Sequence, residues 1–98
     1  MASRHDEVAK RIAKKFAGDY NAHQGVDVVT DKVAIEVETN QTISDAKQQL
    51  QGHQKPAYIA VTSERSIKKA MEATEGTTIG VIDPTGVIVK RSTRKRRR

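Results

Sequence analysis

Apolar residues recur at helical spacing in three segments of the chain, residues 4–17, 41–53 and 63–74. Thr42 and Ser63 precede the second and third segments as candidate N-caps, because their hydroxyls can accept a bond from a free backbone N–H. The side chains that share the inward stripes of these helices are Val8, Ile12, Ala13, Phe16, Ile43, Ala46, Lys47, Leu50, Ile67, Ala70 and Met71. We therefore expect three amphipathic helices.

Five shorter runs predict β-strands. They are residues 25–30, 33–39, 56–62, 77–82 and 86–90, and the polar connection 19–24 can add a short edge strand. The sequence Asp83-Pro84-Thr85-Gly86 is typical of a tight turn, so the last two strands should form a hairpin.

The order of these elements predicts an α/β fold. A strand, a helix and a second strand follow one another over residues 33–62, which suits a right-handed parallel crossover. The two hairpins contribute antiparallel edges. We expect a mixed sheet flanked by helices, in the order α-β-β-α-β-α-β-β.

Charge is distributed unevenly over the 98 residues. The chain has 18 Lys and Arg against 12 Asp and Glu, a formal net charge of +6. The tail 91–98 carries six basic residues and no acid, so 18 − 6 = 12 basic residues balance the 12 acids in the remainder. We expect one domain over residues 1–90 and a disordered tail that contacts nucleic-acid phosphates, although a solubility or localisation signal remains an alternative. The basic tail residues are Arg91, Arg94, Lys95, Arg96, Arg97 and Arg98.

Composition excludes several classes of site. Without cysteine the chain can form neither disulfides nor thiolate zinc sites. No apolar run approaches the roughly 20 residues of a membrane span, and the first residues lack a hydrophobic signal core. We expect a cytoplasmic protein, associated with the nucleoid through its tail.

Three acids stand in the most strand-like part of the chain. Side chains alternate along a strand, so Glu36 and Glu38 share one face of the predicted strand 33–39. A hairpin that pairs Val28 with Ile35 places Asp27 opposite Glu36, and facing like charges destabilise a sheet. Either solvation with Lys or Arg partners offsets this repulsion, or a divalent cation does. The position beside a sheet-covering helix favours the cation, because carboxylates are hard oxygen ligands.

The segments GVDVV (25–29) and IEVE (35–38) resemble the core motif of the PD-(D/E)XK nucleases, which have the restriction-endonuclease-like fold. That motif has an Asp on one hairpin strand and Glu-x-Lys on the next. The resemblance covers roughly residues 3–82 and is greatest to the archaeal Holliday junction resolvases and Mrr-like nucleases. It implies a Mg²⁺- or Mn²⁺-dependent DNA endonuclease, with branched or junction DNA as one substrate class.

The same resemblance implies a set of metal ligands. Asp27, Glu36 and the backbone carbonyl of Val37 would hold the ion. The junction-resolving branch adds a Glu from the first helix, which would be Glu7.

The chain departs from the family at Glu38, which stands where the motif has Lys. Three interpretations remain open: Glu38 acts as a general base or second-metal ligand, Lys47 supplies the missing cation from the next helix, or the fold binds nucleic acid without cutting it. RecB-like members carry Gln-x-x-x-Tyr on that helix, so Gln49 is a candidate phosphate contact.

A homodimer is expected for two reasons. Cutting both strands of a duplex or junction requires two active sites, and the C-terminal hairpin carries more apolar residues than one face of a small sheet can bury. Those residues are Ile79, Val81, Ile82, Val87, Ile88 and Val89.

Overall fold

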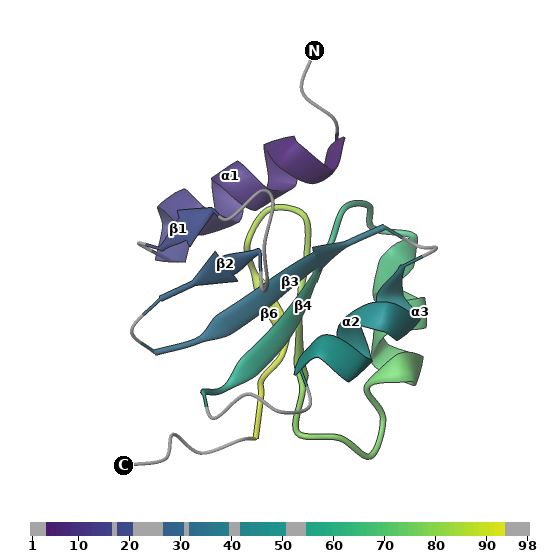
Figure 1. Cartoon of the computed structure of the whole chain (residues 1–98). Helices are drawn as coiled ribbons and strands as arrows, with labels where there is room; N and C mark the ends of the chain where they lie inside the picture. The colour runs from purple at the N-terminus through teal and green to yellow at the C-terminus, as the bar shows by residue number, and fades with distance from the viewer. Residues whose placement is uncertain are drawn as a thin grey trace.

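The structure is a computed structural model that describes residues 4–16, 18–20, 27–30, 32–39, 42–50 and 55–93. Its elements, labelled in Figure 1, are α1 (Arg4–Phe16), β1 (Asp19–Tyr20), β2 (Val28–Val29), β3 (Ala34–Glu38), α2 (Ile43–Leu50), β4 (Ala57–Val61), α3 (Ser66–Ala73), β5 (Gly80–Ile82) and β6 (Ile88–Lys90). The order matches the predicted series with one addition, the short strand β1.

The strands form one mixed sheet in the order β1-β2-β3-β4-β5-β6. The two central pairs, β3 with β4 and β4 with β5, are parallel, whereas the remaining neighbours are antiparallel. Helix α2 connects β3 to β4, as the predicted crossover requires. Every residue of β3 and β4 is buried, because helices cover both faces of the sheet. The expectation of an α/β fold with a mixed sheet is confirmed.

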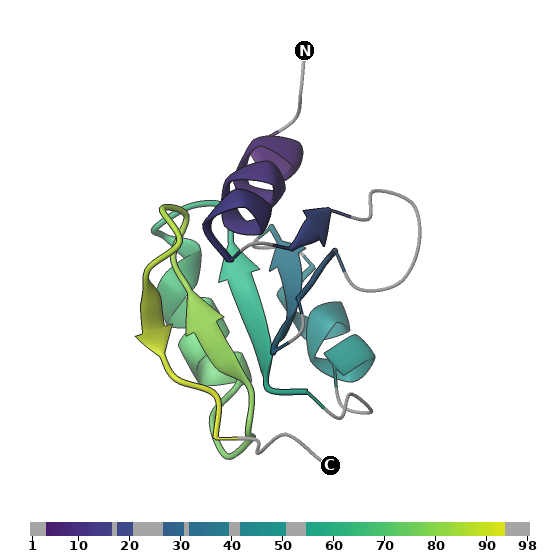
Figure 2. The ribbon, with the colours of Figure 1, turned by 90° about the vertical axis from the view of Figure 1, so that its left-hand side faces the viewer.

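Helix α1 covers one face of the sheet, and α2 and α3 cover the other (Figures 1 and 2). Alternation along β3 divides its side chains between the two layers. Ile35 and Val37 pack with α1, whereas Ala34 packs with α2. Glu36 and Glu38, which alternate with the first pair, therefore point to the α2 side.

The first hairpin has the predicted register. Val28 pairs with Ile35, and the backbone N–H of Thr30 donates to the carbonyl of Val33 at 2.9 Å. One residue further along the ladder, Asp27 comes opposite Glu36. The alternating pattern was sufficient to fix this register, because a one-residue slip would move every apolar side chain to the other face.

One predicted cap and one predicted core residue are wrong. Ser63 does not cap α3: the cap residue is Arg65, and the Ser63 hydroxyl bonds to that of Ser66 instead. Thr42 does occupy the N-cap position of α2, because its carbonyl accepts from the backbone N–H groups of Asp45 and Ala46. Its hydroxyl accepts from the backbone N–H of Thr39 in the preceding turn. Met71 lies on α3 but is 38 % exposed, since α3 is short and only one of its faces contacts the sheet.

The C-terminal hairpin forms as predicted. Asp83 Oδ1 accepts bonds from the backbone N–H groups of Thr85 and Val87, and Gly86 adopts a φ of +94°, a conformation that favours glycine. The tight turn is therefore fixed by its own side chain.

The surplus of apolar residues expected on this hairpin is smaller than predicted. Ile79, Val81 and Ile82 are at most 1 % exposed, because β5 is an inner strand covered on both faces. Only Val87 and Val89 of that set are classed among the exposed large apolar side chains. The homodimer remains a prediction, but this surface no longer supports it.

Two other expectations concern the chain as a whole. No helix in the described part of the chain is long and apolar enough to cross a membrane. In the tail, Arg91 is exposed, and residues 94–98 lie outside the described residues.

Candidate metal centre

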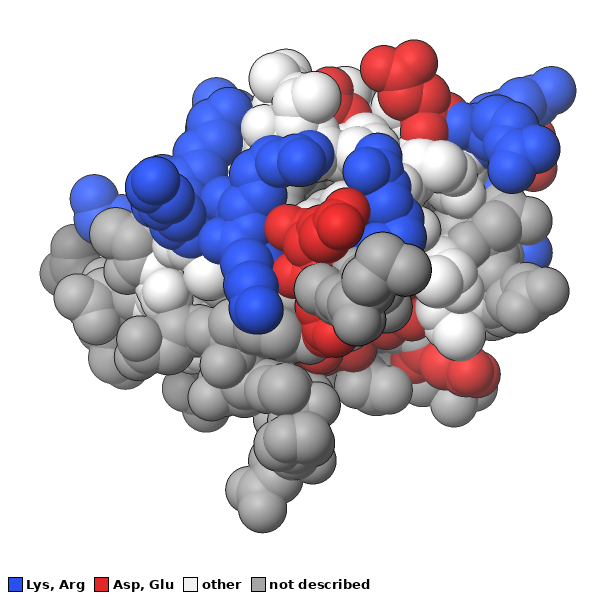
Figure 3. Space-filling view, turned by 90° about the horizontal axis from the view of Figure 1, so that it is seen from above, with Lys and Arg blue, Asp and Glu red and all other residues white. Residues whose placement is uncertain are grey.

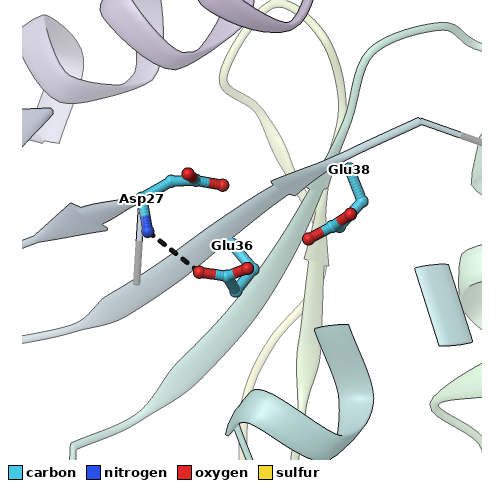
Figure 4. A group of neighbouring side chains, drawn as sticks. All are labelled: Asp27, Glu36 and Glu38. Atoms are coloured by element: carbon cyan, nitrogen blue, oxygen red, sulfur yellow. Dashed lines mark hydrogen bonds between the residues drawn. The ribbon is translucent and has the colours of Figure 1, made fainter. Parts of the chain in front are cut away.

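Asp27, Glu36 and Glu38 come together beside β3, at the N-terminal end of β2 (Figure 4). Each offers a carboxylate oxygen, and these three oxygens all lie within 4.8 Å of one another. The sequence pattern predicts that these three acids lie together, and the structure brings them together.

Two hydrogen bonds fix Asp27 against β3. Its backbone N–H donates to Glu36 Oε1 at 2.9 Å, and its Oδ2 accepts from the backbone N–H of Val37 at 2.9 Å. The Asp27 carboxylate thus accepts the β3 hydrogen bond that the carbonyl of a longer β2 would accept. Asp27 itself lies just before Val28, the first paired residue of β2. Its carboxylate lies at the sheet edge, whereas the predicted arrangement placed all three acids on one face.

The Val37 carbonyl belongs to the same edge. Backbone groups of one residue in a strand point to the same side, and the Val37 N–H points to Asp27. Glu38, the next residue, directs its carbonyl to Thr62 after β4. The carbonyl expected to serve as a metal ligand therefore faces Asp27.

Glu36 and Glu38 are 3 % and 8 % exposed, respectively. Among the residues described, no Lys or Arg forms an ion pair with either glutamate or with Asp27. The two glutamates are therefore buried rather than solvated, and within the described side chains neither has a basic partner. A buried carboxylate without a cation must gain a metal ion or keep its proton.

Raised pKa values of the two glutamates reduce the charge repulsion among the three acids when no metal ion is bound. Burial, assisted by a hydrogen bond to Glu38 and the charge of Asp27, raises the pKa of Glu36 from 4.5 to about 8. Burial also raises the pKa of Glu38, although a hydrogen bond from Thr42 opposes that change. At neutral pH without metal, Glu36 is thus mostly protonated and shares its proton with Glu38.

This protonation gives the metal-free fold a defined pH dependence. In the unfolded chain Glu36 loses its proton near pH 4.5, whereas the folded protein keeps it to about pH 8. The stabilising contribution is complete below the lower value and is lost as pH rises through the higher one. We expect the melting temperature in EDTA to fall from about pH 5 to about pH 8, and Glu36→Gln to flatten this decline. Equal slopes for the two proteins in thermal melts would show that Glu36 keeps no unusual proton.

A basic residue that the sequence analysis did not include also reaches the site. His5, in the first turn of α1, places Nε2 3.3 Å from Asp27 Oδ2 and Nδ1 3.8 Å from Asp6 Oδ1. The structure does not bring Glu7 into the acid cluster: its side chain is exposed and lies 3.9 Å from Arg4 Nη1. Helical periodicity predicts which face of α1 is buried, but not which polar residue beside that face meets the strand end.

The side chains of Lys47 and Gln49 lie outside the described part of α2. Their proposed roles stay predictions.

The donor set fits a hard divalent cation. An octahedral Mg²⁺ with bonds of about 2.1 Å separates its ligand oxygens by about 3 Å when adjacent and about 4.2 Å when opposite. The oxygens of the acid cluster lie within 4.8 Å, so only a small side-chain adjustment is required. Carboxylate and carbonyl oxygens suit Mg²⁺ and Mn²⁺ better than softer metals.

Comparisons with known proteins do not assign this site. No protein-family model, no curated protein and no solved structure matches the chain.

Proposed function

We propose that the protein is a Mg²⁺- or Mn²⁺-dependent DNA endonuclease of the restriction-endonuclease-like fold. The observation that carries this proposal is the group of three acids, two of them buried, without a Lys or Arg partner in the described structure. The resemblance of GVDVV and IEVE to the nuclease motif also supports the proposal. The helix, the hairpin and the β-α-β unit around these acids follow one another in the order that the resemblance implies.

Each acid has a separate part in the proposed reaction. When bound, the metal would activate a water molecule and stabilise negative charge on the scissile phosphate. Asp27, held by the Val37 N–H and His5, presents its carboxylate in a fixed position. Glu36 would hold the ion as a carboxylate, after giving up to the solvent the proton that its raised pKa retains in the metal-free protein.

The position of Glu38 favours one explanation for the missing Lys. Glu38 is buried within the acid cluster, so we propose that it acts as a ligand or general base. The alternative, Lys47 as the missing cation, remains a separate proposal. The substrate structure, including branched or junction DNA, and a homodimer with two active sites also belong to this proposal.

A second candidate function is nucleic-acid binding without cleavage. The specific observation in its favour is the raised pKa of Glu36, because a shared proton makes the acid cluster tolerable without metal. Binding would then depend on basic residues alone, and Mg²⁺ or Mn²⁺ would produce no hydrolysis.

Hydrolysis assays separate the two functions. Linear, nicked and branched DNA should be cut by the wild-type protein with Mn²⁺ and left intact with EDTA. Intact DNA of every form in Mn²⁺, together with measurable binding, would support the second function.

A further inference from the structure

Helix α1 has one apolar face and one basic face. Its apolar residues Val8, Ala9, Ile12 and Ala13 are buried against the sheet. We call the exposed residues Lys10, Arg11, Lys14 and Lys15 the α1 basic face. Figure 3, which views the molecule from the α1 side, shows Lys and Arg side chains gathered on this part of the surface.

The charges of the α1 basic face are not neutralised within the described structure. None of its four residues forms an ion pair with a described carboxylate. Arg11 donates from Nη1 to the carbonyl of Pro84 at 2.8 Å, which fixes its side chain but leaves its charge. Spacing of i, i+4 brings Lys10 next to Lys14 and Arg11 next to Lys15, and like charges at this spacing destabilise a helix. An anionic partner would relieve that repulsion.

The α1 basic face and the acid cluster are joined by one rigid helix. His5, near the N-terminal end of α1, contacts Asp27 of the cluster. From His5 to Lys14 the helix rises about 13 Å, at 1.5 Å per residue. Phosphates along one strand of duplex DNA advance about 3.4 Å each, so this distance corresponds to about four phosphates.

We propose that the α1 basic face binds the sugar-phosphate backbone of the nucleic acid a few nucleotides from the phosphate at the acid cluster. This inference rests on the proposed function for the identity of the neighbouring site. It adds a binding surface that the net charge does not reveal, because residues 1–90 carry no net charge as a whole.

An anionic membrane is the other polyanion that a basic helix can bind. Membrane-surface helices insert their apolar face among the lipids. In α1 that face is already buried, with exposed fractions from 0 % to 7 %. The structure therefore favours nucleic acid.

A charge-matched pair of variants tests this proposal. The first is Lys10→Gln/Lys14→Gln/Lys15→Gln on the α1 basic face. The control is Lys32→Gln/Lys68→Gln/Lys69→Gln, which removes three exposed lysines from the first hairpin turn and from α3, on the opposite layer. Both change the net charge equally, and circular dichroism verifies that both fold.

Affinity of the full-length chain for a fluorescent DNA duplex is measured in EDTA over a range of salt concentrations. With about 0.9 counterions released per phosphate contact, the first variant should lower the slope of log K against log salt by up to about 2.7. At about 0.1 M salt that change corresponds to a loss of affinity of up to about 500-fold, whereas the control should stay within about threefold. Single variants Lys10→Gln and Lys14→Gln should each lower the slope by about 0.9.

Three outcomes would overturn the proposal. One is an equal loss of affinity in both triple variants, which would indicate bulk charge alone. Another is an unchanged slope in the first variant. The third is a loss confined to vesicles of phosphatidylserine and phosphatidylcholine, which would identify a membrane partner. Binding is measured without divalent ions. An absence of cleavage would therefore contradict the proposed function but not the binding of DNA by the α1 basic face.

Discussion

Glu36→Gln should lower the rate of single-turnover DNA cleavage in Mn²⁺ by at least about 10³-fold while the protein stays folded and binds DNA. Glutamine resembles the protonated form of Glu36: its oxygen can still accept from the Asp27 N–H, and its amide can donate to Glu38. The fold at neutral pH therefore loses little. The variant cannot supply a negatively charged ligand, however, so the metal should bind weakly or in the wrong position.

The matched control is Glu64→Gln, which makes the same chemical change at an exposed residue in the turn before α3. It should cleave at the wild-type rate. If Glu36→Gln retains cleavage within about threefold of wild type and Glu64→Gln does the same, the chemistry does not use the acid cluster.

The apparent affinity for Mn²⁺ should rise about tenfold per pH unit below about pH 8 and level off above it. Metal binding must displace the proton that Glu36 holds with a pKa of about 8, so each unit of pH below this value reduces the ionised fraction tenfold. The raised pKa of Glu38 acts in the same direction. Titration calorimetry in buffers of different ionisation enthalpy measures both the affinity and the protons released.

About one proton should be released per Mn²⁺ bound near neutral pH. In Glu36→Gln, both the proton release and the pH dependence of the residual affinity should be reduced. An affinity that stays constant from about pH 6 to about pH 8 in the wild type would mean that Mn²⁺ does not bind at Glu36.

Much of the fold near the acid cluster follows from local sequence patterns. Alternation of apolar and charged residues along β3, together with a short turn, fixes the pairing of Val28 with Ile35. That register alone brings Asp27 next to Glu36. Likewise, the buried run in β4 and the helix before it predict the parallel crossover. These features depend on neighbours in sequence, which is why patterns were sufficient.

The remaining features depend on how separate elements dock. His5 rather than Glu7 reaches Asp27 because of the position of α1 along the sheet, and periodicity gives the buried face of a helix without its axial position. The carboxylate of Asp27 lies beside β3 because β2 begins only at Val28 and leaves the Val37 N–H free to bind it. Strand ends of this kind have no signal in the alternation pattern.

Residue counts also failed to predict which apolar and basic residues lie on the surface. The apolar residues of the C-terminal hairpin suggested a dimer surface, but Val81 and Ile82 lie on an inner strand between two helical layers. The balanced charge of residues 1–90 suggested a neutral body, but α1 gathers basic residues on one exposed face. Composition gives totals, whereas the distribution over faces requires the three-dimensional arrangement.

Divalent-dependent DNA hydrolysis, measured across the elution profile of the purified wild-type protein, decides whether this chain is an endonuclease. Each fraction is incubated with linear and branched DNA in Mn²⁺ and in EDTA, and Glu36→Gln purified in the same way controls for contaminating nucleases. A Mn²⁺-dependent activity that follows the protein peak and is absent from the Glu36→Gln peak is the result that we expect. Fractions of folded, DNA-binding wild-type protein that leave every substrate intact in Mn²⁺ would contradict the account.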